Sequence, residues 1–255
     1  MGASWKIAGA SVIGSSHQRS GGRCEDSWSF SQCDDLENDC IAICVSDGAG
    51  SAVKGWVGAK AASKLVCRWL ISAFDALHGS DDPGWRKSLW RDVRKPLERM
   101  SMISRSDLRD YACTVVSCAV HSDGRWVVVH IGDGAVVGRL ESGFSILSAP
   151  VKGEHANETY FLTDKHFQRN MKVIKGCKSE ERGELTGCAL FSDGLEGSLI
   201  NKRDGTVAPA IAHMLAWLDS RTSSEVAPAV EENLVKVFRP LTTDDCTLVL
   251  AVKTA

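Results

Sequence analysis

The sequence predicts an α+β fold built on antiparallel sheet, and three observations support this class. Short apolar runs of strand type and longer helical runs occur in mixed order, without the regular alternation of βαβ units. Residues 112–147 have the pattern of a meander, in which runs of Val, Ile and Thr are separated by the tight turns HSDGR and LESGF. The 255 residues, 44% of them hydrophobic, suffice for one large core, so we expect a single domain over residues 1–255.

Two strands and a long helical region are expected in the first half of the chain. The runs WKIAGASVIG (5–14) and CIAICVSD (40–47) are short, apolar and partly β-branched. A long helix is expected to follow from Ser51 as its N-cap and to end at GSDDPG (79–84), after which helical spacing resumes with a kink or break at Pro96. The buried stripe of the long helix is expected to comprise Val53, Val57, Ala61, Leu65, Trp69 and Ala73.

The second half continues from the meander into a polar segment and a final group of strands and helices. Residues from about 148 to 186 are polar and weakly periodic, which is typical of a lid or flap. The run GCALFSDG predicts another strand, helical stretches are expected near 206–219 and 224–238, and CTLVLAV predicts the last strand.

Charge and cysteine usage argue against several classes of function. The formal net charge of −2 and the pI near 6.4 leave no basic footprint for nucleic acid or an acidic membrane surface. No apolar run approaches the roughly 18 residues of a membrane span, and the N-terminus lacks the pattern of a secretory signal. The ten cysteines form no C-x-x-C pair and no Cys-x5-Arg loop, so we interpret them as reduced core residues. We expect a cytoplasmic protein.

Four apolar runs carry an acid at one end. Asp47, Asp133 and Asp193 each follow such a run and precede a glycine, whereas the pair Asp244 and Asp245 immediately precedes the last run. If the last strand is antiparallel to the other three, these carboxylates gather on one rim of the sheet. Clustered carboxylates repel one another unless protons or cations compensate, and oxygen ligands suit Mg²⁺ or Mn²⁺.

A simpler interpretation of each Asp-Gly pair is turn chemistry. Asp123-Gly124 lies between polar residues inside an evident hairpin, and we interpret it as a turn only. Asp47 and Asp193 follow longer apolar runs, but the pattern alone leaves the turn interpretation open for them.

The full ordered set of motifs resembles the metal-dependent serine/threonine phosphatases of the protein phosphatase 2C family, from about residue 7 to residue 252. GSSHQRSGGRCEDSWSF is similar to the first motif, with Glu25 and Asp26 as the acidic pair. VSDGAGSA, HIGDGAVV, FSDGLEGSL and DDCTLVLAV are similar to the later ones, in the same order. The SH…G…CED start, the DGAGSA form and GE-x-x-N-x-T at residues 153–159 resemble a compact bacterial branch.

This resemblance implies a four-layer α/β/β/α sandwich, in which two antiparallel sheets are flanked by helices and the acids lie at one end. It implies two Mn²⁺ or Mg²⁺ ions as cofactors, with a third, weaker site. The segment at about 148–186 would be the flap beside the metal centre. By motif, the resemblance implies that Asp47 bridges two ions and that the Gly48 carbonyl binds one of them. Asp193 and Asp244 would complete the first ion site, and Glu25 would complete the second. Asp133 and Asp193 would form the third site, and Asp26 would hold metal-bound water.

The implied reaction is attack on phosphorus by a water shared between two ions, without a phosphoenzyme. The chain departs from the family pattern at two positions. Gly21 stands where many members have an arginine that grips phosphate, and Arg23 or His17 is the candidate replacement. Ala49 stands where eukaryotic members have a histidine that protonates the leaving group, so a water or His17 is expected to serve. A structural or solvated role for His17 remains equally open at this point.

Two other classes of function compete with this interpretation. One is a phosphatase-shaped module that binds phosphoprotein without cleaving it, although every acid expected for two ions is present. The other is a metal-dependent nuclease, which predicts a basic groove that the charge balance does not suggest. The expected partners are a phosphoserine or phosphothreonine protein substrate and a cognate kinase, with no nucleic acid, no membrane and a monomeric state.

Overall fold

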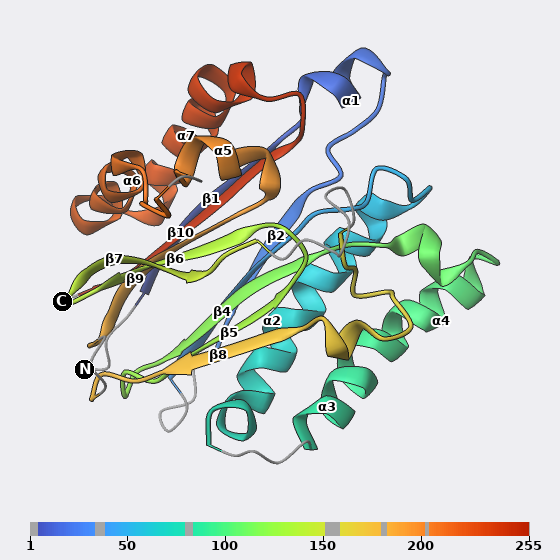
Figure 1. The fold of residues 1–255 in the computed structure, drawn as a ribbon, viewed down its shortest axis with the longest axis horizontal. Helices are drawn as coiled ribbons and strands as arrows, with labels where there is room; N and C mark the ends of the chain where they lie inside the picture. The colour runs from blue at the N-terminus through green and yellow to red at the C-terminus, as the bar shows by residue number, and fades with distance from the viewer. Residues whose placement is uncertain are drawn as a thin grey trace.

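Two five-stranded antiparallel sheets face each other and carry helices on their outer faces (Figure 1). The computed structural model describes residues 5–33, 39–79, 84–150, 159–179, 183–201 and 204–254. This arrangement confirms the predicted α+β class and the four-layer α/β/β/α sandwich. The first sheet has the order β1 (Trp5–Val12), β10 (Cys246–Lys253), β9 (Leu185–Phe191), β6 (Ala135–Leu140) and β7 (Gly143–Ser148). The second has the order β2 (Ser27–Gln32), β3 (Cys40–Ser46), β4 (Val115–His121), β5 (Trp126–Ile131) and β8 (Lys172–Gly176).

The helices form two groups, one on each outer face (Figure 1). The second sheet is covered by α2 (Gly55–Gly79), together with α3 (Gly84–Leu89) and α4 (Lys95–Ile103). The first sheet is covered by α6 (Pro209–Ser220) and α7 (Ser223–Asn233). Two short helices, α1 (Ser15–Arg19) and α5 (Glu196–Leu199), lie next to the ends of strands. No helix within the described ranges is both long enough and apolar enough to cross a bilayer.

The core has three layers because the central strands are buried on both faces. Strand β3 illustrates this, since all seven of its residues are buried. Its alternate side chains point to opposite faces of the sheet. The small residues Ala42 and Cys44 pack toward α2, whereas Ile41, Ile43 and Val45 fill the space between the two sheets. At β3 the space between the sheets is therefore filled by bulky β-branched residues, and the smaller residues on the other face let α2 approach closely.

The long helix differs in detail from the sequence expectation. It begins at Gly55, so Ser51 is not its N-cap, and Val53 lies before the helix with 79% of its surface exposed. Trp69 and Ala73 are buried as expected, but the other stripe positions inside the helix are only half-buried. The reason is geometric, because a strict four-residue spacing turns about 40° further around the helix at each step. The face that meets the sheet carries Ala59, Ala62, Val66, Leu70, Ala73 and Leu77.

Three further elements were placed only roughly or missed. A π-helical turn at Trp90–Arg94 joins α3 to α4 without a break, and Pro96 follows that turn as the second residue of α4. Strand β2 overlaps the end of the motif that carries the acidic pair and was not predicted. Strand β8 lies within the segment interpreted as a flap and pairs with β5, His130 opposite Lys172 and Trp126 opposite Gly176.

Candidate metal centre

The acids of the sequence motifs lie just beyond the last paired residues of neighbouring strands, at one end of the two sheets. Asp26 and Asp47 each stand one residue beyond the pair Ser27–Ser46, which joins β2 to β3. Asp133 and Asp193 each stand two residues beyond the pair Ala135–Phe191, which joins β6 to β9. Asp244 stands two residues before Cys246, where β10 meets the end of β1. Strand β10 is antiparallel to β9, as the shared rim requires.

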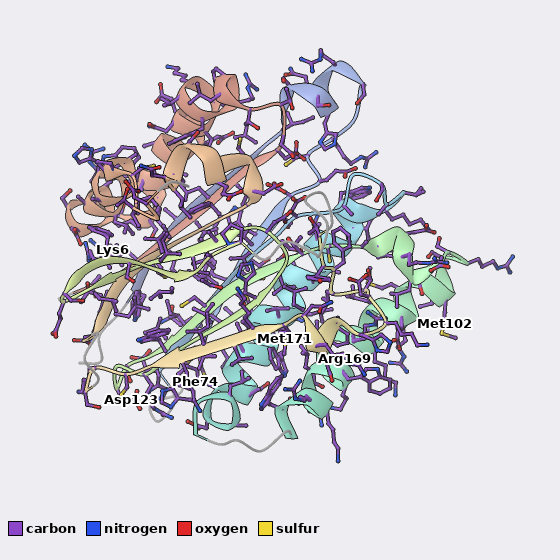
Figure 2. The ribbon with its side chains drawn as sticks, viewed as in Figure 1. Lys6, Phe74, Met102, Asp123, Arg169 and Met171 are labelled. Carbon is purple, nitrogen blue, oxygen red and sulfur yellow. The ribbon has the colours of Figure 1, made fainter. Side chains whose placement is uncertain are left out.

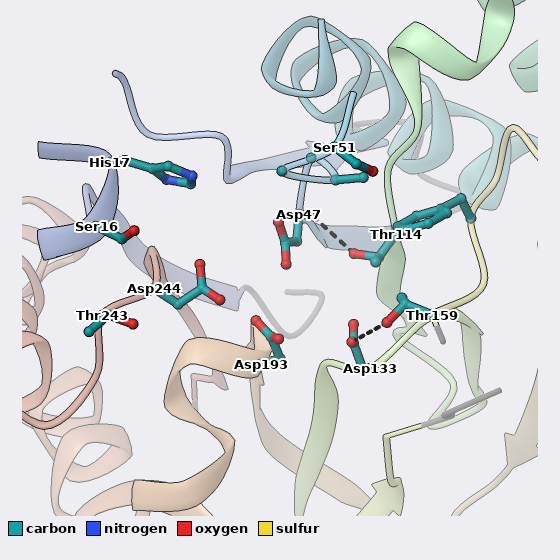
Figure 3. Close-up of a pocket in the computed structure, with 14 residues that line it drawn as sticks. Ser16, His17, Asp47, Ser51, Thr114, Asp133, Thr159, Asp193, Thr243 and Asp244 are labelled. Atoms are coloured by element: carbon teal, nitrogen blue, oxygen red, sulfur yellow. Dashed lines mark hydrogen bonds between the residues drawn. The ribbon is translucent and has the colours of Figure 1, made fainter. Parts of the chain in front are cut away.

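Three of these carboxylates form a compact cluster. One carboxylate oxygen from each of Asp47, Asp133 and Asp193 lies within 4.8 Å of the other two. They line a cavity of about 360 Å³ with Asp244, Gly48 and His17 (Figure 3). Figure 3 shows the four carboxylates converging from different strands on the same space. By contrast, Asp123 lies in the β4–β5 turn at the far end of the sheet (Figure 2), so its interpretation as a turn residue is consistent with its position.

The backbone around Asp133 explains why the motif has a glycine on each side. Here the chain leaves β5 of one sheet and enters β6 of the other. Gly132 has φ 110°, a region that favours glycine, and a Cβ there would lie 2.6 Å from the Thr114 side chain. A Cβ on Gly134 would lie 2.6 Å from the carbonyl oxygen of Phe191. The two glycines therefore allow the tight crossover that delivers Asp133 to the cavity.

The backbone around Asp47 is held from two sides. The Asp47 N–H donates to Thr114 Oγ1 at 3.0 Å, and the Thr114 N–H donates to the Asp47 carbonyl at 2.8 Å. The Gly48 N–H donates to the carbonyl of Glu25 at 3.1 Å. A Cβ on Gly48 would lie 2.4 Å from the carbonyl carbon of Gly55 at the start of α2. Glycine is thus required for the close packing that fixes the first residue after β3.

Burial and mutual repulsion raise the pKa values of the clustered acids. Burial is the main cause for Asp47, whose pKa is well above its ordinary value, and the charges of Asp26, Asp193, Asp244 and Asp133 add to it. Burial, followed by the charges of Asp133 and Asp244, raises the pKa of Asp193 to about 7. Burial also raises the pKa of Asp26 to about 7, against the opposing effect of its hydrogen bond from Ser192.

The donor set fits divalent cations. Glu25 Oε2, Asp26 Oδ1 and Asp193 Oδ1 are buried and have no hydrogen-bond partner among the described residues. Unpaired buried carboxylate oxygens are costly unless a proton or a cation is bound. Every clustered side chain offers oxygen rather than nitrogen or sulfur, which matches the preference of Mg²⁺ and Mn²⁺.

The acidic pair of the first motif lies beside this cluster without lining the cavity. Asp26 is buried and accepts a hydrogen bond from Ser192 Oγ at 2.6 Å. Glu25 is half-buried, and its pKa is raised by burial and by the charges of Asp245 and Asp244. The neighbouring charges of His17 and Arg23 act in the opposite direction.

The two candidates for gripping phosphate are placed differently. Arg23 is exposed, its guanidinium carbon lies 4.5 Å from the ring centroid of Trp56, and it does not line the cavity. His17 does line the cavity. Burial lowers the pKa of His17, but the hydrogen bond to Asp245 and the charges of Asp245, Glu25 and Asp244 outweigh it and raise that pKa above 6.5.

Sequence reasoning gave no role to two residues that contact this site. Thr159 lines the cavity and donates to Asp133 Oδ2 at 2.6 Å; it ends the GE-x-x-N-x-T motif, whose other residues lie outside the described ranges. Asp245 is 2% exposed and bonds to backbone and side chains of the first motif. The signal for Asp245 was present in the Asp-Asp pair, because adjacent residues of an extended chain point in opposite directions.

Comparisons with known proteins agree with the motifs. The family model described as "Protein phosphatase 2C" matches residues 13–239. "Serine/threonine-protein phosphatase 3" of Escherichia coli (strain K12) is 25% identical over 268 residues, covering 98% of each chain. The solved structure of the serine/threonine phosphatase Stp1 from Staphylococcus aureus is similar with a TM-score of 0.62 and 15% identity, covering 99% of this chain and 96% of that one. PppA of Pseudomonas aeruginosa is similar with a TM-score of 0.61 and 14% identity, covering 99% of each.

The structural likenesses concern the fold, whereas the family model spans most of the sequence, including all motifs from the acidic pair to the late Asp-Gly. The chain therefore belongs to the protein phosphatase 2C family and is a protein serine/threonine phosphatase.

Proposed function

We propose that this phosphatase is metal-dependent and hydrolyses phosphoserine and phosphothreonine in proteins at the Asp47–Asp133–Asp193 cluster. The observation that carries the proposal is the convergence of three carboxylates within 4.8 Å, with the pKa values of Asp47 and Asp193 raised by burial and repulsion. Such a cluster is unfavourable at neutral pH without cations. Two Mn²⁺ or Mg²⁺ ions, with a third bound more weakly, would relieve the repulsion.

The ligands are assigned by combining motif and position. Asp47, at the centre of the rim, would bridge two ions, with the Gly48 carbonyl on one of them. Bound ions supply the Lewis acidity that activates a water and neutralises charge on the phosphoryl oxygens. Asp26 keeps Oδ1 free to accept a hydrogen bond from water, while its other oxygen is held by Ser192. The remaining ligands would be Asp193 and Asp244 for the first ion, Glu25 for the second, and Asp133 with Asp193 for the third.

His17 is our candidate for the proton donor to the leaving group. It lines the cavity, whereas Arg23 does not, and Nδ1 is already engaged with Asp245. In this scheme water forms a new bond to phosphorus while the bond to the leaving oxygen breaks. The leaving oxygen takes a proton from Nε2 of the doubly protonated His17 ring, which keeps its Nδ1 proton on the bond to Asp245, and the attacking water releases a proton. The hydrolysed ester thus leaves as an alcohol, with inorganic phosphate as the second product.

The cellular setting is also a proposal. All ten cysteines are free thiols, and seven of them are buried, which is typical of a reducing compartment. This supports a cytoplasmic location. A phosphoprotein substrate and a cognate kinase would then be present in the same compartment, with the enzyme acting as a monomer.

Activity assays with and without metal test the proposed function. The purified protein should hydrolyse p-nitrophenyl phosphate and a phosphothreonine peptide with Mn²⁺ or Mg²⁺, lose this activity in EDTA, and leave DNA uncut. Full activity in metal-free protein would refute the metal-dependent mechanism. Tight binding of the phosphopeptide without turnover would support the phosphoprotein-binding module instead, and cleavage of DNA would support a nuclease.

A further inference from the structure

Asp245 joins three parts of the first motif through one buried carboxylate. Its Oδ1 accepts a hydrogen bond from the Gly14 N–H at 2.6 Å. Its Oδ2 accepts from the Glu25 N–H at 2.6 Å and lies 3.0 Å from His17 Nδ1. The side chain is 2% exposed, so these bonds are shielded from competing water.

The neighbouring acid has a different environment. Asp244 lines the cavity, and its Oδ1 accepts a hydrogen bond from the Asp245 N–H at 2.8 Å. Asp245 is absent from the cavity lining and points toward the segment between Gly14 and Glu25. The two adjacent acids therefore have different roles. The Asp244 carboxylate faces the cavity with the clustered carboxylates, and the Asp245 carboxylate holds the segment that carries His17.

The contact with Asp245 also sets the orientation of the His17 ring. A carboxylate only accepts hydrogen bonds, so Nδ1 must carry the proton in this pair. Nε2 has no partner among the described residues, and the ring projects from α1 toward the cavity (Figure 3). A histidine held in this way presents the same nitrogen to whatever enters the cavity.

We propose that Asp245 is a positioning residue for phosphoester hydrolysis, acting by fixing the His17 ring with Nδ1 bonded and Nε2 turned toward the leaving group. This rests on the proposed function, because the role of His17 is part of it. The assignment extends beyond the metal ligands, and it gives the second acid of the closing motif a task of its own.

The test is a double-mutant cycle with two leaving groups. His17→Gln should lower kcat about 100-fold for a phosphoserine peptide, whose alkoxide needs a proton, and less than about tenfold for p-nitrophenyl phosphate, whose leaving group is stable without one. Asp245→Asn should show the same dependence on the leaving group. The double variant should lose no more than His17→Gln alone, because Asp245 acts through His17.

The matched control is Asp123→Asn. His121 Nδ1 lies 3.1 Å from Asp123 Oδ1, so the chain has a second His–Asp pair, remote from the cavity. This variant should hydrolyse both substrates at the wild-type rate. Equal losses on both substrates in Asp245→Asn, additive losses in the double variant, or unchanged kcat in Asp245→Asn would each overturn the proposal.

Two further measurements separate positioning from loss of the fold or of the proposed function. Calorimetric titration with Mn²⁺ should show that Asp245→Asn still binds the ion; complete loss of binding would mean that Asp245 acts through the metal site, and the proposal would fall. Nitrogen NMR of the metal-free protein should find His17 protonated at Nδ1 in the wild type and not fixed so in Asp245→Asn. If the NMR signals of His17 are the same in Asp245→Asn and in the wild type, the orienting role of Asp245 is refuted, whatever the activity. If the wild type hydrolyses neither substrate, only the proposed function is refuted.

Discussion

Asp133 and Asp193 extend from opposite strands beyond the same rung of one sheet, the pair Ala135–Phe191, and their carboxylates meet at the cavity. The antiparallel register of β6 and β9 fixes the positions of both residues and so brings them close together. The charge of Asp133 is one cause of the raised pKa of Asp193. The fold therefore places two like-charged groups side by side, and a bound proton or cation is needed to offset their repulsion.

Removing the central charge of the cluster should stabilise the metal-free protein while abolishing turnover. Asp47→Asn relieves repulsion with Asp26, Asp193 and Asp133, so the thermal midpoint of metal-free protein at pH 8 should rise. Mn²⁺ should no longer raise that midpoint, and phosphatase activity should fall at least about 100-fold. Asp123→Asn, which loses a surface ion pair with Arg125 and a contact with His121, should lower stability by less than ~1 kcal/mol and keep its activity. Wild-type turnover in Asp47→Asn would contradict the bridging role.

The stability of the metal-free protein should decrease as the pH rises. Asp26 and Asp193 have folded pKa values of about 7, above their ordinary value of 3.8. Groups with raised folded pKa values bind protons more tightly in the folded state, so their stabilising effect is complete below the unfolded pKa and is lost as the pH rises through about 7. Calorimetry from pH 5 to pH 8 should show a falling midpoint in EDTA and a much flatter one in Mn²⁺. A flat profile in EDTA would show that the acids do not repel one another.

The hydroxyl of Thr159 should matter for metal binding more than for folding. Thr159→Val removes the 2.6 Å hydrogen bond that orients Asp133, so the affinity for one of the bound ions should fall about tenfold in a calorimetric Mn²⁺ titration. Thr206→Val offers a matched control, because its hydroxyl donates to Asp204 Oδ1 at 2.7 Å in an exposed turn. An identical Mn²⁺ titration curve for Thr159→Val and wild type would remove Thr159 from the site.

A single methyl group on the long helix should destabilise the fold. Ala is normally favoured over Gly in a helix, by about 1 kcal/mol. At position 58, however, a Cβ would lie 2.1 Å from the carbonyl oxygen of Tyr111, so Gly58→Ala should lower the free energy of unfolding by about 1–3 kcal/mol. Gly197→Ala, where a Cβ meets nothing within 4 Å, should leave stability unchanged or raise it slightly. Chemical denaturation of both variants decides between local propensity and packing.

The gathering of acids at one end of the sheets was predictable because the position of each acid depends only on the end of its own strand. An apolar run followed by an acid and a glycine marks a strand end, and the control at Asp123 was separated correctly by its polar neighbours. The different contacts of the Asp244 and Asp245 side chains were not predictable in this way. They depend on which face of the chain meets Gly14, 231 residues away.

The errors elsewhere have similar physical causes. Ser51 has the right residue type for an N-cap, but the helix begins only at Gly55, whose backbone packs closely against Gly48. Strand β8 has weak alternation because it is an edge strand with polar and exposed positions, so its segment was interpreted as a flap. It runs away from the rim, since Lys172 pairs with His130 and Gly176 with Trp126. A substrate-contacting role for the whole segment from about 148 to 186 remains a prediction, and residues 151–158 and 180–182 of that segment lie outside the described ranges.

The position of β10 has a consequence for how the protein is made. It is the last strand of the described chain, yet it lies between β1 and β9 in its sheet. During translation, β1 emerges long before β10. Because β10 is its only strand partner among the described residues, neither edge of β1 is paired until β10 has left the ribosome. Asp244 and Asp245 emerge immediately before β10. Until β10 has emerged and paired, therefore, the first sheet, the cavity lining at Asp244 and the contact between Asp245 and His17 are all incomplete.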